Sequence, residues 1–187
     1  MEDSSKHSAI FNEAMKLVAK HEGGWSNDPT DRGGATNYGI SLRFLKGLPK
    51  FIGDIDHDGD VDVDDIKSLT PDKAKELYYS QFWVPLNVEN LRHPWVQIKV
   101  FDMAVNMGNK RSITLLQRGF NLSSPIFHLK VDGALGPKSI AAMNAANGEN
   151  LLKRFQEECI KFYEAIVRND ASQSKYIKGW KNRVYSF

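Results

Sequence analysis

The sequence predicts a mainly α-helical protein, on three observations. Apolar residues recur at spacings of three and four along most of the chain, which is the period of one helix face. Helix start and stop signals, such as Thr70-Pro71 and Gly108-Asn109, bracket these segments. Only residues 33–40 combine glycine, threonine and tyrosine in the manner of a hairpin. At 187 residues the chain slightly exceeds one typical domain of about 150 residues, so we expect a single domain over residues 1–187.

The first part of the chain is expected to hold two helices around a loop-rich insert. The first helix covers residues 10–21, and glycines stop it. Its apolar face consists of Ile10, Ala14, Leu17 and Val18. The insert contains the hairpin and residues 47–53, whose composition is poor for a helix. The second helix covers residues 71–83, because the Thr70 hydroxyl caps it and Pro71 fills a position whose N–H would lack a partner.

The second part of the chain predicts further helices. They are expected over residues 100–107, 113–120, 137–143 and 152–166. The longest carries an almost continuous apolar stripe, and Gly136-Pro137 opens the short helix before it. The basic and aromatic residues 175–187 fit a final helix docked on the core as well as they fit contact with a membrane or a polysaccharide.

Composition excludes several classes of protein. Hydrophobic residues make up 41% and charged residues 26%, which excludes a disordered or collagen-like chain. No apolar run approaches the roughly 18 residues of a transmembrane helix. The one cysteine, Cys159, excludes an intramolecular disulfide and indicates synthesis in a reducing compartment. Glu2 and Asp3 stand where a signal peptide is basic, so we expect no signal peptide and a soluble protein made in a cytoplasm.

The charge distribution predicts an anionic partner. The net charge is +2, but seven of the 23 acidic residues lie within residues 54–65, which leaves 25 basic against 16 acidic residues elsewhere. The basic residues of the tail are Lys175, Lys178, Lys181 and Arg183. A protein with this excess of basic residues is expected to bind nucleic acid, phospholipid or an anionic cell-wall polymer. The sign of the charge alone does not choose among these partners.

Glu22 is the first candidate catalytic residue. It ends the first helix, where unsatisfied carbonyls disfavour an anion, so its pKa should rise. The aromatic residues Trp25 and Tyr38 would add desolvation in the same direction. A carboxylic acid that holds its proton near neutral pH is what a glycosidase needs as general acid. The alternative is that Glu22 is a solvated helix end beside a glycine C-cap.

The segment around Glu22 resembles a known family. Its blocks are Glu22-Gly23-Gly24-Trp25, Asn27-Asp28-Pro29 and Gly33-Gly34-Ala35-Thr36-Asn37-Tyr38-Gly39-Ile40. They resemble the signature of the glycoside hydrolase 108 family, lysozyme-like N-acetylmuramidases found as phage endolysins and prophage-encoded secretion activators. The similarity continues in residues 74–83, 101–108 and 178–184, so it covers nearly the whole chain. The resemblance implies an α-rich lysozyme-like fold with Glu22 as the catalytic acid.

The resemblance also implies the other site residues. Related lysozyme-like enzymes use an aspartate and then a threonine at similar separations, so Asp31 and Thr36 are candidates for positioning water or stabilising the oxocarbenium-like state. Asp28 is the competing carboxylate, although Asn-Asp-Pro is also a common turn. The residues expected to bind substrate are Trp25, Asp28, Tyr38 and Asn106. Carboxyl groups about 5 Å apart would imply retention and a wider gap inversion, so the stereochemical course stays open.

Residues 54–65 predict a calcium loop inserted into this fold. They match the EF-hand template at positions 1, 3, 5, 6, 9 and 12, with a glycine at the sharp turn. The expected ligands are Asp54, Asp56, Asp58, Asp60, Asp62 and Asp65. Because a poor helix precedes the loop, it resembles the half EF-hand of a dockerin. The alternative is a solvated acidic loop.

Residues 131–139 resemble the Asp-Gly…Gly-Pro turn of peptidoglycan-binding repeats. A turn that only starts a helix is an equally good interpretation. We therefore divide the expected domain into a catalytic half, residues 1–110, and a helical half, residues 111–187, that resembles a peptidoglycan-binding region.

Together these features predict a monomeric muramidase that binds Ca²⁺. It would hydrolyse the β-1,4 bond between N-acetylmuramic acid and N-acetylglucosamine in peptidoglycan strands. By resemblance it is a phage endolysin made in the host cytoplasm and released by a holin to the periplasm and cell wall. Its basic tail would contact an anionic outer-membrane or wall surface, and no nucleic acid is expected. The alternatives are a secretion activator that remodels the wall locally and a non-catalytic wall-binding protein.

Overall fold

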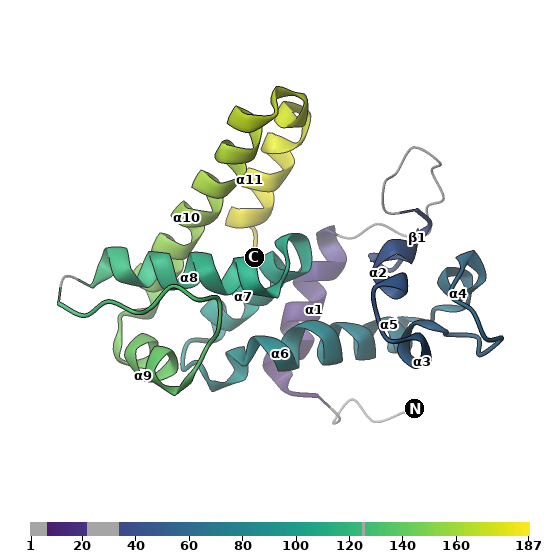
Figure 1. Cartoon of the computed structure of the whole chain (residues 1–187). Coiled ribbons are helices and arrows are strands. Elements are labelled where there is room, and N and C mark those ends of the chain that lie inside the picture. The colour runs from purple at the N-terminus through teal and green to yellow at the C-terminus, as the bar shows by residue number, and fades with distance from the viewer. Residues whose placement is uncertain (1–6, 22–33, 125) are drawn as a thin grey trace. The chain divides into compact units, whose positions relative to one another are not determined.

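The computed structural model describes residues 7–21, 34–124 and 126–187 (Figure 1). Its elements are almost all helices, which confirms the predicted fold class. The chain forms two compact units, one of Met1–Leu17 with Tyr79–Phe187 and the other of Val18–Tyr78. In the parts of the chain that the structure describes, no helix has the length and apolar character needed to cross a membrane.

The Val18–Tyr78 unit is built of short elements around a hairpin. They are the end of α1 (Ala9–His21), β1 (Thr36–Asn37), β2 (Ile40–Ser41), α2 (Leu42–Lys46), α3 (Lys50–Gly53), α4 (Val63–Ser68) and α5 (Pro71–Tyr78). The strands are antiparallel, with Thr36 opposite Ser41. Tyr38 and Gly39 form the turn with φ of 49° and 76°, the positive pair that a tight two-residue hairpin turn requires. The predicted hairpin is therefore present but short.

The other unit contains the long helices. After the first part of α1 come η1 (Tyr79–Trp83), α6 (Val84–Leu86), η2 (Val88–Asn90), α7 (Pro94–Met107), α8 (Asn109–Ser123), α9 (Pro137–Ala145), α10 (Gly148–Asn169), η3 (Ala171–Tyr176) and α11 (Ile177–Tyr185). Helix α10 packs against α8 and α11 (Figure 1). A Cβ at Gly119 of α8 would lie 2.8 Å from the Phe155 nitrogen, so the close approach of α8 to α10 depends on this glycine.

An aromatic cluster forms part of the core of this unit. The ring of Phe11 meets those of Trp83 and Phe101 edge to face, at centroid distances of 5.3 and 5.7 Å. Trp83 and Phe101 pack against each other in the same way at 5.4 Å. Trp83 ends the π-helical turn η1, which continues α5 and which helical periodicity alone does not predict.

A buried ionic cluster joins α7 to the C-terminal turn. The Lys99 ammonium, fully buried, donates to Asp102 Oδ2 at 3.0 Å and to the carbonyls of Arg183 and Ser186 at 2.9 and 2.6 Å. Arg183 Nε donates to Asp102 Oδ1 at 2.9 Å. Asp102 and Arg183 belong to two separate blocks of the family resemblance, so the structure gives both of these residues a role in holding α11 on α7.

Several element boundaries differ from the sequence predictions, among them the start of α7 and residues 50–53. Helix α7 begins at Pro94, several residues before the predicted apolar stripe, because proline suits the first turn of a helix. Residues 50–53 form one helical turn, α3, before the acidic loop, although this segment was expected to be a poor helix. Cys159 is fully buried on α10, in agreement with its place on the apolar stripe.

Candidate functional site

The expected site residues divide into those inside and those outside the structure's described ranges. Glu22, Trp25, Asp28 and Asp31 lie outside the described residues. The described ones are Thr36 and Tyr38 on the hairpin, Asn106 on α7 and the acidic residues of the 54–65 loop.

The hairpin is held to the helices of its unit by side-chain hydrogen bonds. The Tyr78 hydroxyl of α5 donates to the Tyr38 carbonyl at 3.1 Å, and Asn37 Nδ2 donates to the Ile66 carbonyl of α4 at 3.1 Å. The half-buried Thr36 donates its hydroxyl proton to the Gly34 carbonyl at 3.3 Å. Its oxygen lone pairs can therefore accept a hydrogen bond from a ligand or a water molecule.

Tyr38 presents an exposed aromatic ring. Its side chain lies at the hairpin turn, where the residue is 40% exposed. Its backbone is fixed by the bond from Tyr78 and by its positive φ. A rigid backbone with an exposed ring suits stacking on an apolar face of a ligand such as a sugar ring.

Asn106 lies in the last turn of α7. Its Oδ1 accepts a hydrogen bond of 2.5 Å from the Tyr163 hydroxyl of α10. The Tyr163 ring stacks on Trp180 of α11 at 4.9 Å. Burial raises the pKa of Tyr163, so its hydroxyl stays protonated and donates to Asn106. This bond orients the exposed Asn106 amide and leaves its NH₂ group as a donor.

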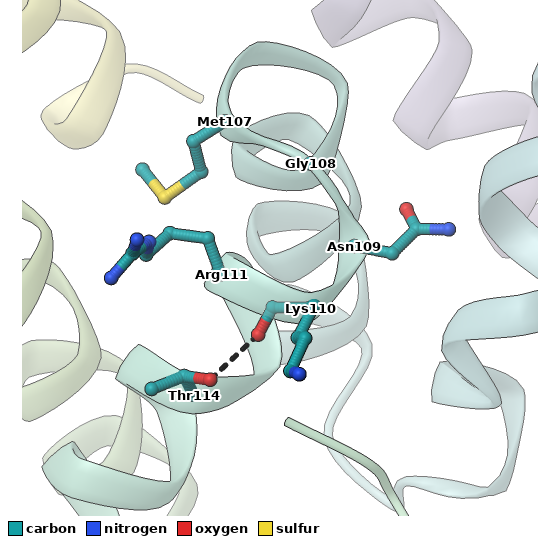
Figure 2. A pocket seen from close by; sticks show the side chains of 6 residues that line it. All are labelled: Met107, Gly108, Asn109, Lys110, Arg111 and Thr114. Atoms are coloured by element: carbon teal, nitrogen blue, oxygen red, sulfur yellow. Dashed lines mark hydrogen bonds between the residues drawn. The ribbon is translucent and has the colours of Figure 1, made fainter. Parts of the chain in front are cut away.

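A basic pocket follows Asn106 at the α7–α8 corner. Figure 2 shows its lining, which consists of Met107, Gly108, Asn109, Lys110, Arg111 and Thr114. Its volume is about 440 Å³. Gly108 has φ of 87°, which lets the chain turn directly from α7 into α8. The Thr114 hydroxyl donates to the Lys110 carbonyl at 2.7 Å, the dashed line in Figure 2. Through Lys110 and Arg111 the pocket offers cationic donors for a polar ligand.

The acidic loop is organised around the buried carboxylate of Asp65. Its Oδ1 accepts a hydrogen bond from the Ile55 amide at 2.5 Å, and its Oδ2 accepts one from the Asp62 amide at 2.6 Å. Asp62 in turn caps α4 by accepting from the Asp64 amide at 2.6 Å. Gly59 has φ of 102°, as a sharp turn of this loop requires. Part of the acidic pattern therefore folds the loop and starts α4.

The loop also brings carboxylates close enough to share a metal ion. Two sets have oxygens within 4.8 Å of one another, namely Asp54, Asp56 and Asp65, and Asp60, Asp62 and Asp65. The two sets share Asp65. Asp58 belongs to neither set, and its Oδ1 accepts from the Asp60 amide at 3.0 Å. Asp54 Oδ1 is buried with no hydrogen-bond partner in the described part of the chain.

The electrostatics of the loop favour a cation. Partial desolvation and the neighbouring Asp58 raise the pKa of Asp56. Repulsion from Asp58, followed by desolvation, raises the pKa of Asp60. Both shifts reflect crowded negative charge, which a bound cation would relieve. The arrangement can thus hold a metal ion through hard oxygen donors.

Two of the four basic side chains of the tail form ion pairs with other residues of the chain. Lys181 pairs with Glu164 of α10 at 2.7 Å, and Arg183 pairs with Asp102. Lys175 and Lys178 are exposed. Trp180 stacks on Tyr163, whereas Tyr185 is exposed. The tail is therefore in large part a docked helix, and its remaining basic surface is smaller than the sequence suggests.

The Asp-Gly turn at residues 132–133 is fixed by a residue that sequence reasoning missed. The buried Gln117 of α8 donates through Nε2 to Asp132 Oδ1 and to the Ala134 carbonyl, both at 2.9 Å. Its Oε1 accepts from the amides of Asp132 and Gly133 at 3.0 and 2.8 Å. The one sequence signal for this role was that Gln117 is a polar residue on the apolar face of α8. That signal does not indicate which residues Gln117 contacts.

The comparisons with known proteins agree with the resemblance drawn from the sequence. A family model described as Glycosyl hydrolase 108 matches residues 15–108, and one described as Predicted Peptidoglycan domain matches residues 111–185. A solved structure of Brucella abortus SagA is similar, with a TM-score of 0.73 and 27% sequence identity. The match covers 93% of this chain and 88% of that one. No curated protein matches the chain.

Proposed function

Because the chain belongs to the glycosyl hydrolase 108 family, we propose that it is an N-acetylmuramidase. The family and the predicted peptidoglycan domain make it a glycoside hydrolase that acts on peptidoglycan at the cell wall. The proposed bond is the β-1,4 linkage from N-acetylmuramic acid to N-acetylglucosamine. The observation that carries this proposal is the block from Glu22 to Ile40, which lies within the matched residues 15–108.

In the proposed mechanism Glu22 is the general acid. It directly follows His21, the last residue of α1. Its carboxyl proton passes to the glycosidic oxygen as the C1–O bond breaks and positive charge develops on the sugar. Asp31 stabilises that charge or accepts a proton from the attacking water. The Thr36 hydroxyl, which donates to Gly34, accepts a hydrogen bond from that water.

The proposed binding residues act through stacking and amide hydrogen bonds. The exposed Tyr38 ring, with Trp25, stacks on a sugar face, and Asp28 accepts from sugar hydroxyls. On the other compact unit, the Asn106 NH₂ group donates to a polar group of the glycan. Its orientation follows from the hydrogen bond that its Oδ1 accepts from Tyr163.

The test is Glu22→Gln, assayed on purified peptidoglycan by mass spectrometry of the released fragments. The amide cannot donate the proton, so the rate should fall by about 10²–10⁴-fold. Glu13→Gln, an exposed residue of α1 that pairs with Lys16, is the matched control and should retain full activity. A Glu22→Gln protein that is folded and active at the wild-type rate would refute the assignment. Fragments with N-acetylglucosamine at the reducing end would refute muramidase specificity.

Ca²⁺ is the proposed occupant of the 54–65 loop, where it acts on stability. The support is the two carboxylate sets that meet at Asp65 and the buried, unpartnered Asp54 Oδ1. Ca²⁺ accepts many oxygen ligands in flexible geometry, whereas Mg²⁺ prefers to keep its waters. Asp58 Oδ1 accepts from the Asp60 amide, and its second carboxylate oxygen, Oδ2, can still bind the cation.

The proposed biological role is that of a phage-type endolysin, which reaches the wall of the host after release by a holin. Rapid loss of turbidity in permeabilised bacteria would support lysis. Slow release of wall fragments without lysis would favour the alternative, a secretion activator that remodels the wall. Binding to the wall without any release of fragments would favour the remaining alternative, a non-catalytic wall-binding protein.

A further inference from the structure

A second pocket lies at the start of α9, within the residues matched by the predicted peptidoglycan domain. We call it the α9 pocket. Its volume is about 720 Å³, and its lining includes Phe127, Leu129, Lys130, Pro137, Lys138 and Ser139. It shares no residue with the hairpin, the acidic loop or the pocket beside Asn106. Its lining thus combines apolar side chains with two lysines.

One wall of the α9 pocket is held in place by amide side chains of α8. Asn121 forms a two-way bond with the backbone of Leu129, accepting at 2.7 Å and donating at 2.9 Å. Gln117 holds the turn at Asp132 through the four bonds described above. The segment that bounds the pocket is thus fixed without a ligand, so binding there would cost little ordering entropy.

The first turn of α9 carries free hydrogen-bond donors on residues that line the pocket. Gly136 is the N-cap and has no side chain to satisfy the free amides. The first intrahelical bond runs from the Ile140 amide to the Gly136 carbonyl. The amides of Lys138 and Ser139 precede it and have no partner in the described part of the chain. Ser139 is only 8% exposed, and its hydroxyl, on the pocket lining, also has no partner there.

Charge in the α9 pocket favours an anion. The ammonium groups of Lys130 and Lys138 are exposed and make no ion pair within the described residues. Asp132 is the carboxylate of the lining, and its Oδ1 is already engaged by Gln117 and by the Ala134 amide at 3.1 Å. His128 also lines the pocket. Two cations and the positive end of the α9 dipole therefore outweigh one carboxylate that is hydrogen-bonded to the protein.

We propose that the α9 pocket binds the C-terminal alanine carboxylate of a peptidoglycan peptide stem. Peptide stems carry carboxylates and methyl groups, whereas the glycan backbone offers mainly hydroxyls and amides. The carboxylate oxygens accept hydrogen bonds from the Ser139 hydroxyl and the first amides of α9, and Lys138 supplies charge. The alanine methyl group contacts Phe127, which is 50% exposed, and Pro137. The inference rests on peptidoglycan as the substrate and would let the chain engage wall that still carries its stems.

The test is binding of a synthetic stem peptide to the full chain by calorimetry. The probe is acetyl-L-Ala-D-isoglutamine-L-Lys-D-Ala, which has one carboxylate, compared with its C-terminal amide. The acid should bind at least about tenfold more tightly, because the amide loses the charge-assisted bonds. Ser139→Ala and Lys138→Gln should each weaken binding of the acid about fivefold. Lys153→Gln, an exposed lysine of α10 away from the pocket, is the matched control and should bind as the wild type does.

Three results would overturn the proposal. These are equal binding of acid and amide, wild-type affinity in both pocket variants, and inorganic phosphate binding as tightly as the peptide. Circular dichroism of Ser139→Ala checks the fold, and Lys138→Gln changes only an exposed side chain. Hydrolysis of glycan strands stripped of peptides tests the proposed muramidase by itself. Hydrolysis without peptide binding would refute only the α9 pocket, and peptide binding without hydrolysis would refute only the muramidase.

Discussion

Replacing Lys99 by methionine should destabilise the protein strongly. Lys99 is fully buried, and its ammonium bonds to Asp102, to the Arg183 carbonyl and to the Ser186 carbonyl. Methionine keeps most of the apolar stem and removes all three bonds. Asp102 Oδ1 keeps its bond to Arg183 Nε, and the Arg183 carbonyl still accepts from the Ser186 hydroxyl at 2.9 Å.

The size of the effect follows from these contacts. Breaking a buried ion pair by removing one partner costs about 3–5 kcal/mol. Because Arg183 still pairs with Asp102, we expect the lower end, about 3 kcal/mol. For a chain of 187 residues this corresponds to a fall in Tm of roughly 6–12 °C, at about 2–4 °C per kcal/mol. Lys178→Met, an exposed lysine of α11, is the matched control and should change stability by less than about 0.5 kcal/mol.

Urea unfolding and the reactivity of Cys159 measure this loss independently. Burial raises the pKa of the Cys159 thiol, so it reacts with thiol reagents only when the protein opens. A loss of about 3 kcal/mol raises the open population about 10²-fold, and labelling should accelerate by that factor. A Lys99→Met protein within 1 kcal/mol of wild type, with unchanged labelling, would refute the role given to this cluster.

The remaining predictions concern the candidate site and the acidic loop. Asp31→Ala should lose more peptidoglycan hydrolysis than Asp28→Ala, and the reverse order in folded variants would make Asp28 the partner of Glu22. Thr36→Val keeps the side-chain volume and removes the hydroxyl, so kcat should fall while Tm stays within about 2 °C, and unchanged kcat would contradict its contact with water. Ca²⁺ at a hundredfold excess over Kd should stabilise the protein by about 2.7 kcal/mol, seen as a Tm that falls with chelator and returns with Ca²⁺. Asp56→Ala/Asp58→Ala should abolish that rise, and an equal rise in the double variant would refute the loop as the binding site.

Local patterns predicted the helices well because each depends on nearby residues. The stripe from Leu152 to Ile166 lies within α10, and Gly136-Pro137 starts α9 as expected. Glycine also ended α7 where it was expected, since Gly108 adopts a positive φ. The start of α7 and the π turn η1 were not predicted, because packing rather than local preference decides them.

Residues of the candidate site were predictable only where they lie together in one short sequence motif. The spacing of the aspartates in the 54–65 loop predicts which carboxylates could bind a metal ion. It does not indicate that Asp58 Oδ1 accepts a hydrogen bond from the Asp60 amide. Thr36 and Tyr38 were proposed as site residues through the motif that contains them, and they stay a prediction. Residues 131–139 were identified as a turn before a helix, but the α9 pocket was not predicted, because Gln117 and Asn121 of a different helix hold part of its wall.

The sequence by itself determined the fold class and the family, because these depend on residue identity and short-range spacing. Only the tertiary structure decided what many individual residues do. Asp102 and Arg183 stand in separate motif blocks, and folding pairs them at 2.9 Å in a buried cluster with Lys99. The physical reason is desolvation. A charge removed from water has to find its partner in space, and that partner can lie anywhere along the chain.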